Sequence, residues 1–548
     1  MKSWKNVLSL GLVLVLIVGV LAGCGSSSSG SSAPAQNSAP AQSAGDNSSS
    51  SAAPAAAAAP AEDKMFNVVL TAAFSGFDPL RTNDSASTYV NAQIYETLYR
   101  IDPITGEYNC LLAAELPEFS DDGMTATVKL REGVYFHDGE PFNSEAVKYT
   151  FELIKDPDFG SARASIATSI DSIECPDDYT VVFHLNYEDG VLTAKFAHTN
   201  SAIVAPQAQQ DRDLMIDPVG TGPYKFVSSI SGSNVVLTAN EDYWGGAPAI
   251  KNVTMTIVTE ESTALARMQT GEADFMPNVS VESIPRIDAM PDVTFETSDA
   301  AQIYMMAMRS DSYVNPIMAE PEFRKAIAMS IDKEGYVEYI MENYAVAAES
   351  VLGPKITGYT DEATTHNIPY DPDGAKAILA AHPGWADEEI LFLVPTSPAY
   401  AAMGEYFMSN LTNVGFNIKY EPIDWAAWLN ESKVDNRFDI TMMAWSNVTR
   451  DGSELMEPNF DGVTTTIRIR FNEEDTNAIH ELIKAGKQTS DMAVRTENLL
   501  AVNAYLQDNA FVQPLYHGVN MYCYNNAYTG VTRDPGGTFY LIDIGYAA

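Results

Sequence analysis

The chain has 548 residues, with 73 acidic against 32 basic side chains and a formal net charge of −41. A nucleic-acid-binding protein needs a concentration of basic residues, so this charge balance excludes that class and disfavours attachment to anionic lipid through surface charge. Hydrophobic residues make up 46% and charged residues 19% of the chain, which is typical of a soluble globular protein long enough for two or three domains.

The first 23 residues have the layout of a secretory signal peptide. Lys2 and Lys5 precede an aliphatic stretch, residues 7–20, which is shorter than the roughly 20 residues that a spanning helix needs. Residues 21–24 read Leu-Ala-Gly-Cys, which resembles a bacterial lipobox. The resemblance implies that residues 1–23 are a lipoprotein signal peptide and that Cys24 is lipidated. An ordinary cleaved signal and a membrane-spanning anchor are the alternatives.

Residues 24–62 consist almost entirely of Ser, Ala, Gly and Pro. Such a composition cannot bury enough apolar surface to offset the entropy of ordering, so this segment is predicted to be a disordered tether. A lipid on Cys24 would then hold the globular part at the cell surface, on the outer face of the cytoplasmic membrane. This arrangement suits a Gram-positive cell, and a Gram-negative inner-membrane lipoprotein is the alternative.

After the tether, short β-branched segments alternate with amphipathic ones. Asn143 or Ser144 can cap a helix with one apolar face, Asp371 followed by Pro372 begins a second helix, and a third is expected from about 401 to 415. Strands rich in β-branched residues are expected at 125–130, 180–185 and 253–258. This mixture predicts an α/β body of several lobes.

Common catalytic and metal-binding motifs are absent from the sequence. There is no G-x-S-x-G, H-E-x-x-H or Walker lysine motif, and the seven histidines include no pair at helical ligand spacing. Cys110, Cys175 and Cys523 form no C-x-x-C pair, so at most one disulfide can form and free thiols are the default interpretation. The sequence therefore predicts no enzyme, no cofactor and no metal site. A hydrolase that uses carboxylates far apart in the sequence stays open.

A series of short motifs follows the tether in a fixed order and covers nearly the whole remaining chain. They are Phe77-Asp78-Pro79, Ile94-Tyr95-Glu96-Thr97-Leu98, Lys129-Leu130-Arg131-Glu132-Gly133-Val134, Phe136-His137-Asp138-Gly139-Glu140-Pro141-Phe142, Val219-Gly220-Thr221-Gly222-Pro223-Tyr224, Asn240-Glu241-Asp242-Tyr243-Trp244, Gly271-Glu272-Ala273-Asp274, Phe323-Arg324-Lys325-Ala326-Ile327 and Gln513-Pro514-Leu515-Tyr516. In this order and spacing the set resembles family 5 of the extracellular solute-binding proteins, the oligopeptide, dipeptide and nickel-type receptors of ABC importers.

The resemblance implies an α/β fold of the two-lobed periplasmic-binding-protein type (type II, cluster C) with an extra inserted domain. Two segments are expected to cross between the lobes, at 302–305 and at 515–520. The implied domains are lobe I at 65–98, 205–300 and 520–548, an inserted domain at 99–204, and lobe II at 301–519. Most motif residues, such as Gly220, Gly222 and Arg324, are expected to be structural.

The resemblance also implies a function: capture of a peptide or peptide-like solute between the lobes and delivery to an ABC permease with its ATPase subunits. The protein is expected to act as a monomer. Two alternatives remain, namely the same role for an oligosaccharide or other polar metabolite, and a surface lipoprotein enzyme or adhesin on this fold. Whether the receptor feeds the cell or signals to it is also open.

The predicted site centres on Trp425 and Trp445, which match two solute-facing tryptophans about twenty residues apart in peptide-binding relatives. An aromatic wall offers apolar area without requiring one ligand sequence. Tyr304, on a predicted crossing, is included, and Trp428 is expected to pack inside its helix.

Peptide receptors of the family carry an aspartate three residues after the second tryptophan, where it pairs with the ligand's free α-amino group. This chain has Val448 there, which cannot accept a charge-assisted hydrogen bond. Asp451 could substitute only if the loop is rearranged. Asn447 and Arg450 instead predict a pocket for a carboxylate, a phosphate or a neutral polar group. Ser446 is included in the same predicted site.

Overall fold

The computed structural model describes residues 64–102, 104–311, 315–463 and 469–548. The predicted signal peptide, Cys24 and the predicted tether lie outside the described residues. Within the described part, no helix combines the length and the apolar character needed to cross a membrane.

The helices are distributed along the whole described chain. They are α1 (Ser85–Ile94), α2 (Ser144–Lys155), α3 (Leu192–Phe196), α4 (Pro206–Asp211), α5 (Glu261–Thr270), α6 (Ile284–Asp288), α7 (Pro321–Met329), α8 (Lys333–Tyr339), α9 (Pro372–Ala381), α10 (Pro398–Val414), α11 (Trp425–Lys433), α12 (Gly452–Phe460), α13 (Glu473–Lys487) and α14 (Met492–Asp508).

One large mixed sheet runs through the described part, in the order β15-β14-β16-β12-β17-β11-β1-β10-β9-β8, with β13 paired to β17 outside this path. Its strands are β1 (Met65–Leu70), β8 (Tyr224–Ile230), β9 (Asn234–Ala239), β10 (Asn252–Ile257), β11 (Phe275–Met276), β12 (Val293–Met308), β13 (Ala345–Ala347), β14 (Glu389–Pro395), β15 (Asn417–Ile423), β16 (Ile440–Ser446) and β17 (Val512–Asn525).

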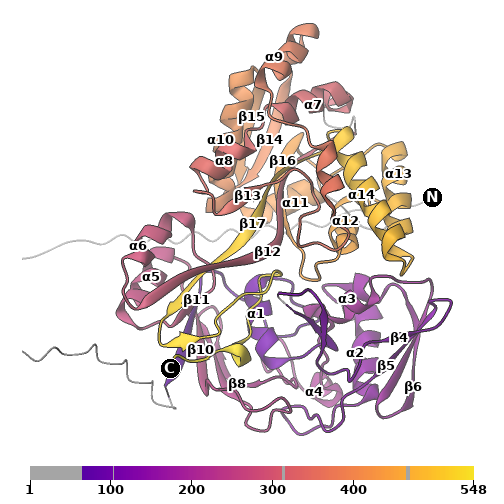
Figure 1. Cartoon of the computed structure of the whole chain (residues 1–548), viewed down its shortest axis with the longest axis vertical. Coiled ribbons are helices and arrows are strands. Elements are labelled where there is room, and N and C mark those ends of the chain that lie inside the picture. Colours follow the sequence, from indigo (N-terminus) through magenta and orange to yellow (C-terminus); the bar gives the residue numbers. More distant parts are fainter. Residues whose placement is uncertain (1–63, 103, 312–314, 464–468) are drawn as a thin grey trace, which may run out of the picture. The chain divides into compact units, whose positions relative to one another are not determined.

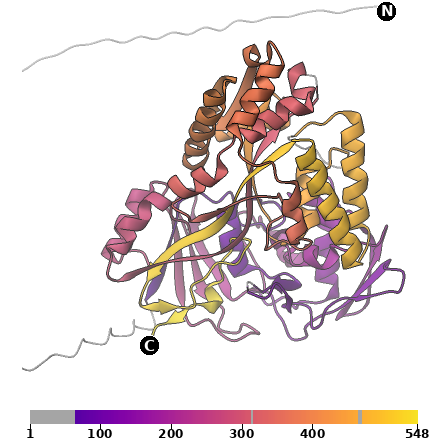
Figure 2. The same cartoon turned by 45° about the horizontal axis from the view of Figure 1, so that its top comes forward.

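The strands β12 and β17 lie in the middle of this sheet and connect its two halves, β15-β14-β16 and β11-β1-β10-β9-β8. They pair in antiparallel fashion from Val293 opposite Asn525 to Ala307 opposite Val512, and the ladder is irregular between Asp299 and Ile303 of β12. Figures 1 and 2 show them running side by side from the α5–α6 region to the α7–α11 region. The two crossings predicted from the sequence, 302–305 and 515–520, lie within these strands.

A second sheet has the order β4-β5-β7-β6 and lies entirely within residues 99–204. Helix α2 packs against it, and the rings of Phe151, Phe183 and Phe196 meet between helix and sheet with centroids 4.7–5.3 Å apart. The remaining strands are β2 (Tyr99–Ile101), β3 (Tyr108–Cys110), β4 (Glu118–Phe119), β5 (Thr125–Lys129), β6 (Ile170–Asp177), β7 (Thr180–Leu185), β18 (Tyr528–Thr529) and β19 (Gly545–Tyr546).

The predicted elements are confirmed where a local signal existed. Strands β5, β7 and β10 match the three predicted strands to within a residue. Asn143 caps α2 through its side-chain oxygen, which accepts from the backbone N of Ala146, and Asp371 caps α9 in the same way. Helix α10 ends against Gly415, whose φ of 117° reverses the chain, but it starts three residues earlier than predicted.

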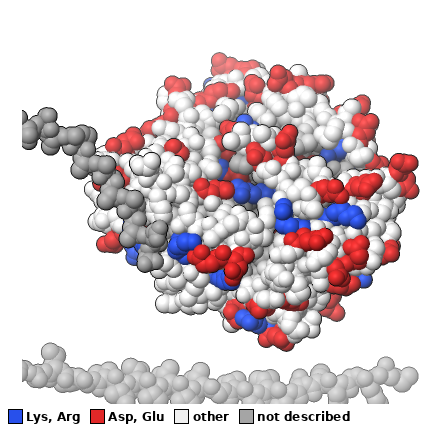
Figure 3. Space-filling view, turned by 60° about the horizontal axis from the view of Figure 1, so that its bottom comes forward, with Lys and Arg blue, Asp and Glu red and all other residues white. Residues whose placement is uncertain are grey.

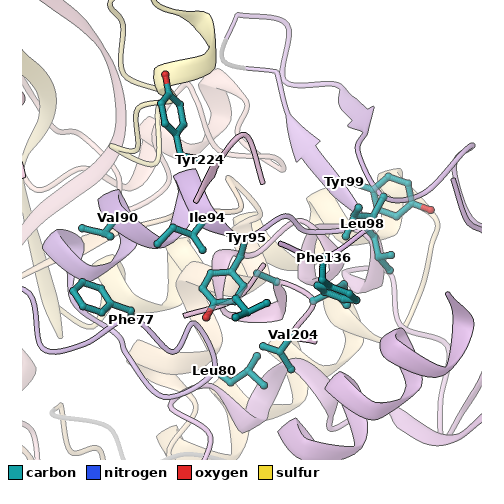
Figure 4. Packing of buried hydrophobic residues seen from close by; sticks show 14 of the residues in the cluster. Phe77, Leu80, Val90, Ile94, Tyr95, Leu98, Tyr99, Phe136, Val204 and Tyr224 are labelled. Atoms are coloured by element: carbon teal, nitrogen blue, oxygen red, sulfur yellow. The ribbon is translucent and has the colours of Figure 1, made fainter. Parts of the chain in front are cut away.

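Two motif glycines pack against the end of α1, beside the largest core cluster. Gly220 and Gly222 pass so close to the end of α1 that a Cβ would lie 2.1 Å and 2.7 Å, respectively, from the carbonyl oxygen of Ile94. Ile94, Phe77 and Tyr224 are buried in the apolar cluster that these turns enclose (Figure 4). These contacts support the structural role expected of the motif.

On the face drawn in Figure 3, Asp and Glu side chains are scattered widely, and Lys and Arg lie among them.

Candidate functional site

A cavity of about 600 Å³ lies beside the crossing strands. Its lining comes from distant parts of the chain: the start of α1, residues 198–200, β12, β16, β17 and residues 533–538. Several of these segments belong to opposite halves of the large sheet, so both halves contribute to the wall of the cavity.

Aromatic rings form one wall of the cavity. Asp424 accepts hydrogen bonds from the first backbone N–H groups of α11, and this cap makes Trp425 the first helical residue, with 46% of its surface exposed. The ring of Trp425 stacks on Trp428 at 4.9 Å and lies 5.9 Å from the ring of Tyr400. Trp445 enters from β16, where it is opposite Ile303 of β12.

Trp428 plays a different role from its neighbour. Its side chain is buried among the apolar residues under β14 and β16, and its Nε1 donates to Oγ1 of Thr441 at 2.9 Å. Only part of it reaches the cavity wall. The prediction that Trp428 packs on the interior side of its helix is confirmed.

The structure brings four of the predicted site residues to this cavity. They are Trp425, Trp445, Ser446 and Tyr304. Tyr304 stacks on Tyr516 of β17 at 4.3 Å, so a residue from each crossing strand supports the wall.

The other three predicted residues lie elsewhere. Asn447 is buried, lines a separate cavity of about 230 Å³ and donates to the backbone oxygen of Asp451. Arg450 adopts a φ of 57° and donates to the backbone oxygens of Lys355 and Asp102. Asp451 caps α12 and accepts from Nη2 of Arg495 with both carboxylate oxygens, at 2.8 Å and 2.6 Å. None of the three lines the aromatic cavity.

Val448 itself lines the cavity. Its backbone lies against Gly536, where a Cβ would come within 3.1 Å of the Cα of Val448. The position at which peptide receptors are expected to carry an aspartate therefore presents an apolar side chain to the cavity.

Sequence reasoning missed Arg163, His198 and Arg533 in the cavity wall. Arg533 is tied to the backbone oxygens of Pro277 and Gly537 and to the hydroxyl of Tyr89, so it holds the wall together. Burial, together with the charge of Arg163, lowers the pKa of His198 well below its usual value. No local motif surrounds these residues, and only the fold brings them together.

A buried charge cluster lies behind Arg163, between residues 187–195 and helices α12–α14. Lys195 pairs with Asp189 at 2.7 Å, Lys487 with Glu457 at 2.7 Å, and Arg495 with Asp451 at 2.6 Å. Burial alone would lower the pKa of Lys195, but Asp189 and Glu454 raise it above its usual value. We refer to these three pairs as the charge cluster.

Backbone contacts join the same two parts of the chain, residues 187–195 and the region of helices α12–α14. The backbone N of Gly190 donates to the oxygen of Lys487 at 3.0 Å, and a Cβ on Gly190 would lie 1.8 Å from the backbone oxygen of Thr489. Oε1 of Glu188 accepts from the backbone N and the hydroxyl of Ser490.

Among the residues described, no three His, Cys, Asp or Glu side chains come together as a possible metal site. Cys110, Cys175 and Cys523 carry free thiols.

A two-part α/β body with a lined cavity beside two crossing strands defines a solute-binding protein. Residues 107–489 match the model of the bacterial extracellular solute-binding proteins, family 5 Middle, and the chain belongs to that family. The family resemblance read from the sequence motifs is thereby confirmed, and the family is one of extracellular solute-binding proteins.

Two curated relatives are similar over part of the chain. The glutathione-binding protein GsiB of Pectobacterium atrosepticum is 30% identical over 315 residues, which are 57% of this chain and 60% of that protein. The match thus spans less than two thirds of that relative. The oligopeptide-binding protein AppA of Bacillus subtilis is 25% identical over 396 residues, 68% of this chain and 71% of that protein.

The fold is similar to that of a dipeptide-binding protein from Pseudoalteromonas sp. SM9913, solved in complex with Met-Leu. The TM-score is 0.78 at 22% sequence identity, covering 88% of this chain and 100% of that chain. This likeness confirms the predicted fold class.

Proposed function

We propose that this chain is the solute-binding receptor of an ABC importer, which captures a peptide or peptide-like solute in the aromatic cavity and delivers it to a permease with its ATPase subunits. The observation that carries the proposal is the cavity of about 600 Å³ whose lining comes from both halves of the sheet. Its size falls within the range of roughly 300 to 1,000 Å³ usual for small-molecule sites.

Binding and closure follow from the position of this cavity. A solute that touches both halves gains all its contacts only when the halves are closed, so it shifts the population towards the closed form. The irregularity of the ladder between Asp299 and Ile303 is where β12 can bend. We assign residues 65–98, 205–300 and 520–548 to lobe I, residues 99–204 to the inserted domain and residues 301–519 to lobe II.

Val448 restricts the class of solute. A free N-terminal ammonium buried beside it would lack its acceptor, at a cost of a few kcal/mol. The favoured solutes are therefore peptide-like molecules whose amino group is masked or lies elsewhere. The name of the glutathione-binding relative supports a small peptide-like solute. A non-peptide polar metabolite is the second candidate, since the aromatic wall requires no peptide.

The protein is further proposed to act as a monomer tethered through a lipid on Cys24 to the outer face of the cytoplasmic membrane, as in a Gram-positive cell. Mass spectrometry of membrane-extracted protein tests this directly. A diacylglycerol adduct on an N-terminal Cys24 is expected, and an unmodified N-terminus would contradict the anchor.

A thermal-shift screen tests the receptor role. Purified protein is heated with N-acetylated and free di- to pentapeptides, glutathione, sugars, polyamines and organic acids. A solute at 100 times its Kd should stabilise the protein by about 2.7 kcal/mol. A response to free peptides that disappears on N-acetylation would show the inference from Val448 to be wrong. No thermal shift with any compound of the panel would contradict the receptor role.

A further inference from the structure

The imidazole of His198 is fixed in one tautomer by the backbone. The N–H of Asn200 donates to Nδ1 of His198 at 3.0 Å, so Nδ1 carries no proton. A neutral ring whose Nδ1 accepts must carry its proton on Nε2. The Nε2 atom is therefore a hydrogen-bond donor, and His198 is 96% buried with only 4% of its surface exposed.

This donor faces another donor. Nε2 of His198 lies 3.2 Å from Nη2 of Arg163, and a guanidinium has no acceptor atoms. Nε of Arg163 is also buried and has no hydrogen-bond partner within the part of the chain that the structure describes. Buried donors without acceptors are rare in native proteins and call for an occupant.

The neighbouring carboxylates do not fill this gap. Oε2 of Glu454 lies 3.4 Å from Nη2 of Arg163, longer than the roughly 2.7–2.9 Å of a close charge-assisted hydrogen bond. Asp84, an acidic residue in the cavity lining, uses its carboxylate to accept from the backbone and hydroxyl of Ser87 and the hydroxyl of Ser75. Arg163 and His198 both line the aromatic cavity, whereas Glu454 does not.

We propose that Arg163 and His198 form an anion subsite of the cavity, which binds a carboxylate of the solute. This proposal rests on the proposed function and narrows its substrate class. A carboxylate has only acceptor atoms, so it can accept from Nε2 of His198 and from the guanidinium of Arg163 together. The ring of Trp445, 5.8 Å from Cζ of Arg163, lies beside this group and can cover the apolar part of the same solute.

The test compares acids with masked acids. The probes are N-acetyl-Met-Leu against its C-terminal amide, and glutathione against its diethyl ester, each titrated calorimetrically into the full-length protein. In the wild type the acid is expected to bind at least about tenfold more tightly than its masked partner. R163Q should weaken the acid by roughly 10- to 100-fold and leave the masked partner unchanged, as expected for hydrogen bonds to a charged group.

Two further variants control the experiment. His198→Asn keeps a side-chain oxygen that can accept from the backbone N of Asn200 but removes the Nε2 donor, and should weaken the acid alone. Arg212→Gln removes an exposed arginine paired with Asp217, away from the cavity, and should change neither affinity.

The outcomes separate this proposal from the receptor role. Binding of masked or neutral solutes as tightly as acids overturns the anion subsite and leaves the receptor role intact. No binding by any solute of the wider screen overturns both. A readout independent of ligand and variants is the histidine tautomer in ¹⁵N NMR spectra: a proton on Nε2 of His198 is expected, and a proton on Nδ1 contradicts the proposal.

Discussion

The cavity wall at Arg163 and the charge cluster behind it are built from the same kinds of residue, but they differ in how their polar atoms are satisfied. In the charge cluster, Lys195 and Arg495 each have a buried carboxylate within 2.7 Å. In the wall, Arg163 reaches Glu454 only at 3.4 Å and leaves its Nε without a partner in the described part of the chain. Buried charges that are fully paired hold the fold, and donors left over beside a cavity point to a ligand.

Removal of one partner from the charge cluster should give the largest loss of stability. Lys195→Met leaves Asp189 buried without its cation and removes a neighbouring positive charge from Glu454, so we expect a loss of about 3–5 kcal/mol in the free energy of unfolding. Urea denaturation measures this loss. Lys376→Met, at an exposed position, is the control, with a change within about 0.5 kcal/mol. A loss at Lys195 as small as that of the control would show that the cluster does not hold the fold.

The close approach at Gly190 offers a second way to disturb the cluster. Gly190→Ala places a methyl group against the backbone oxygen of Thr489, and overpacking of this kind costs about 1–3 kcal/mol. Thermal unfolding should show the loss. Gly545→Ala is the matched control, since its Cβ would meet nothing closer than 4.0 Å. Equal melting temperatures for the two variants would contradict the packing described here.

A buried acid outside both regions, Glu96, makes the stability of the fold depend on pH. Glu96 accepts from the hydroxyl of Tyr243 and from Nε1 of Trp244, and burial raises its pKa to about 6. The folded protein thus holds this proton more tightly than the unfolded chain, so stability should fall by about 2 kcal/mol as pH rises from about 4.5 to above 6. Glu96→Gln should flatten this part of the stability–pH profile. An unchanged slope would mean that other groups produce it.

Trp445 should affect affinity rather than stability. Trp445→Ala removes half-buried aromatic surface from the cavity, and we expect about tenfold weaker binding of any solute found in the screen. Trp428→Ala is the contrasting variant, because loss of its buried ring should destabilise the fold by about 3–5 kcal/mol. Calorimetric titration and urea denaturation of both variants separate the two effects. If both variants lost affinity and stability to the same extent, Trp445 and Trp428 would not differ in role.

The smallest effect is expected at Arg450. Arg450→Gln lies outside the cavity, so solute affinity should change by less than about twofold, which corresponds to about 0.4 kcal/mol. Calorimetric titration with the same solute checks this. A tenfold loss would bring Arg450 back into the site that the sequence first suggested.

Local signals in the sequence predicted the elements well because each depends on neighbouring residues. Asn143, Asp371 and Gly415 end or begin helices through contacts within a few residues. The two cavity tryptophans could be found from their spacing in the family. Asp451 could have been recognised as a cap, since Glu454 follows three residues later in the pattern of a capping box.

The anion subsite could not be predicted in this way. Arg163, His198 and Trp445 come from three distant segments, and their relation depends on how residues 99–204 pack against the rest of the chain. The tautomer of His198 depends on one backbone contact that no pattern of side chains encodes.

The pairing of β12 with β17 has a mechanical consequence. The strands are hydrogen-bonded to each other on both sides of the irregular stretch between Asp299 and Ile303. Around this stretch the two strands are held to each other, so a change of twist in one is passed to the other. We therefore expect the two sheet halves to move relative to each other by bending at this stretch, so that a solute held by one half turns that half as a unit.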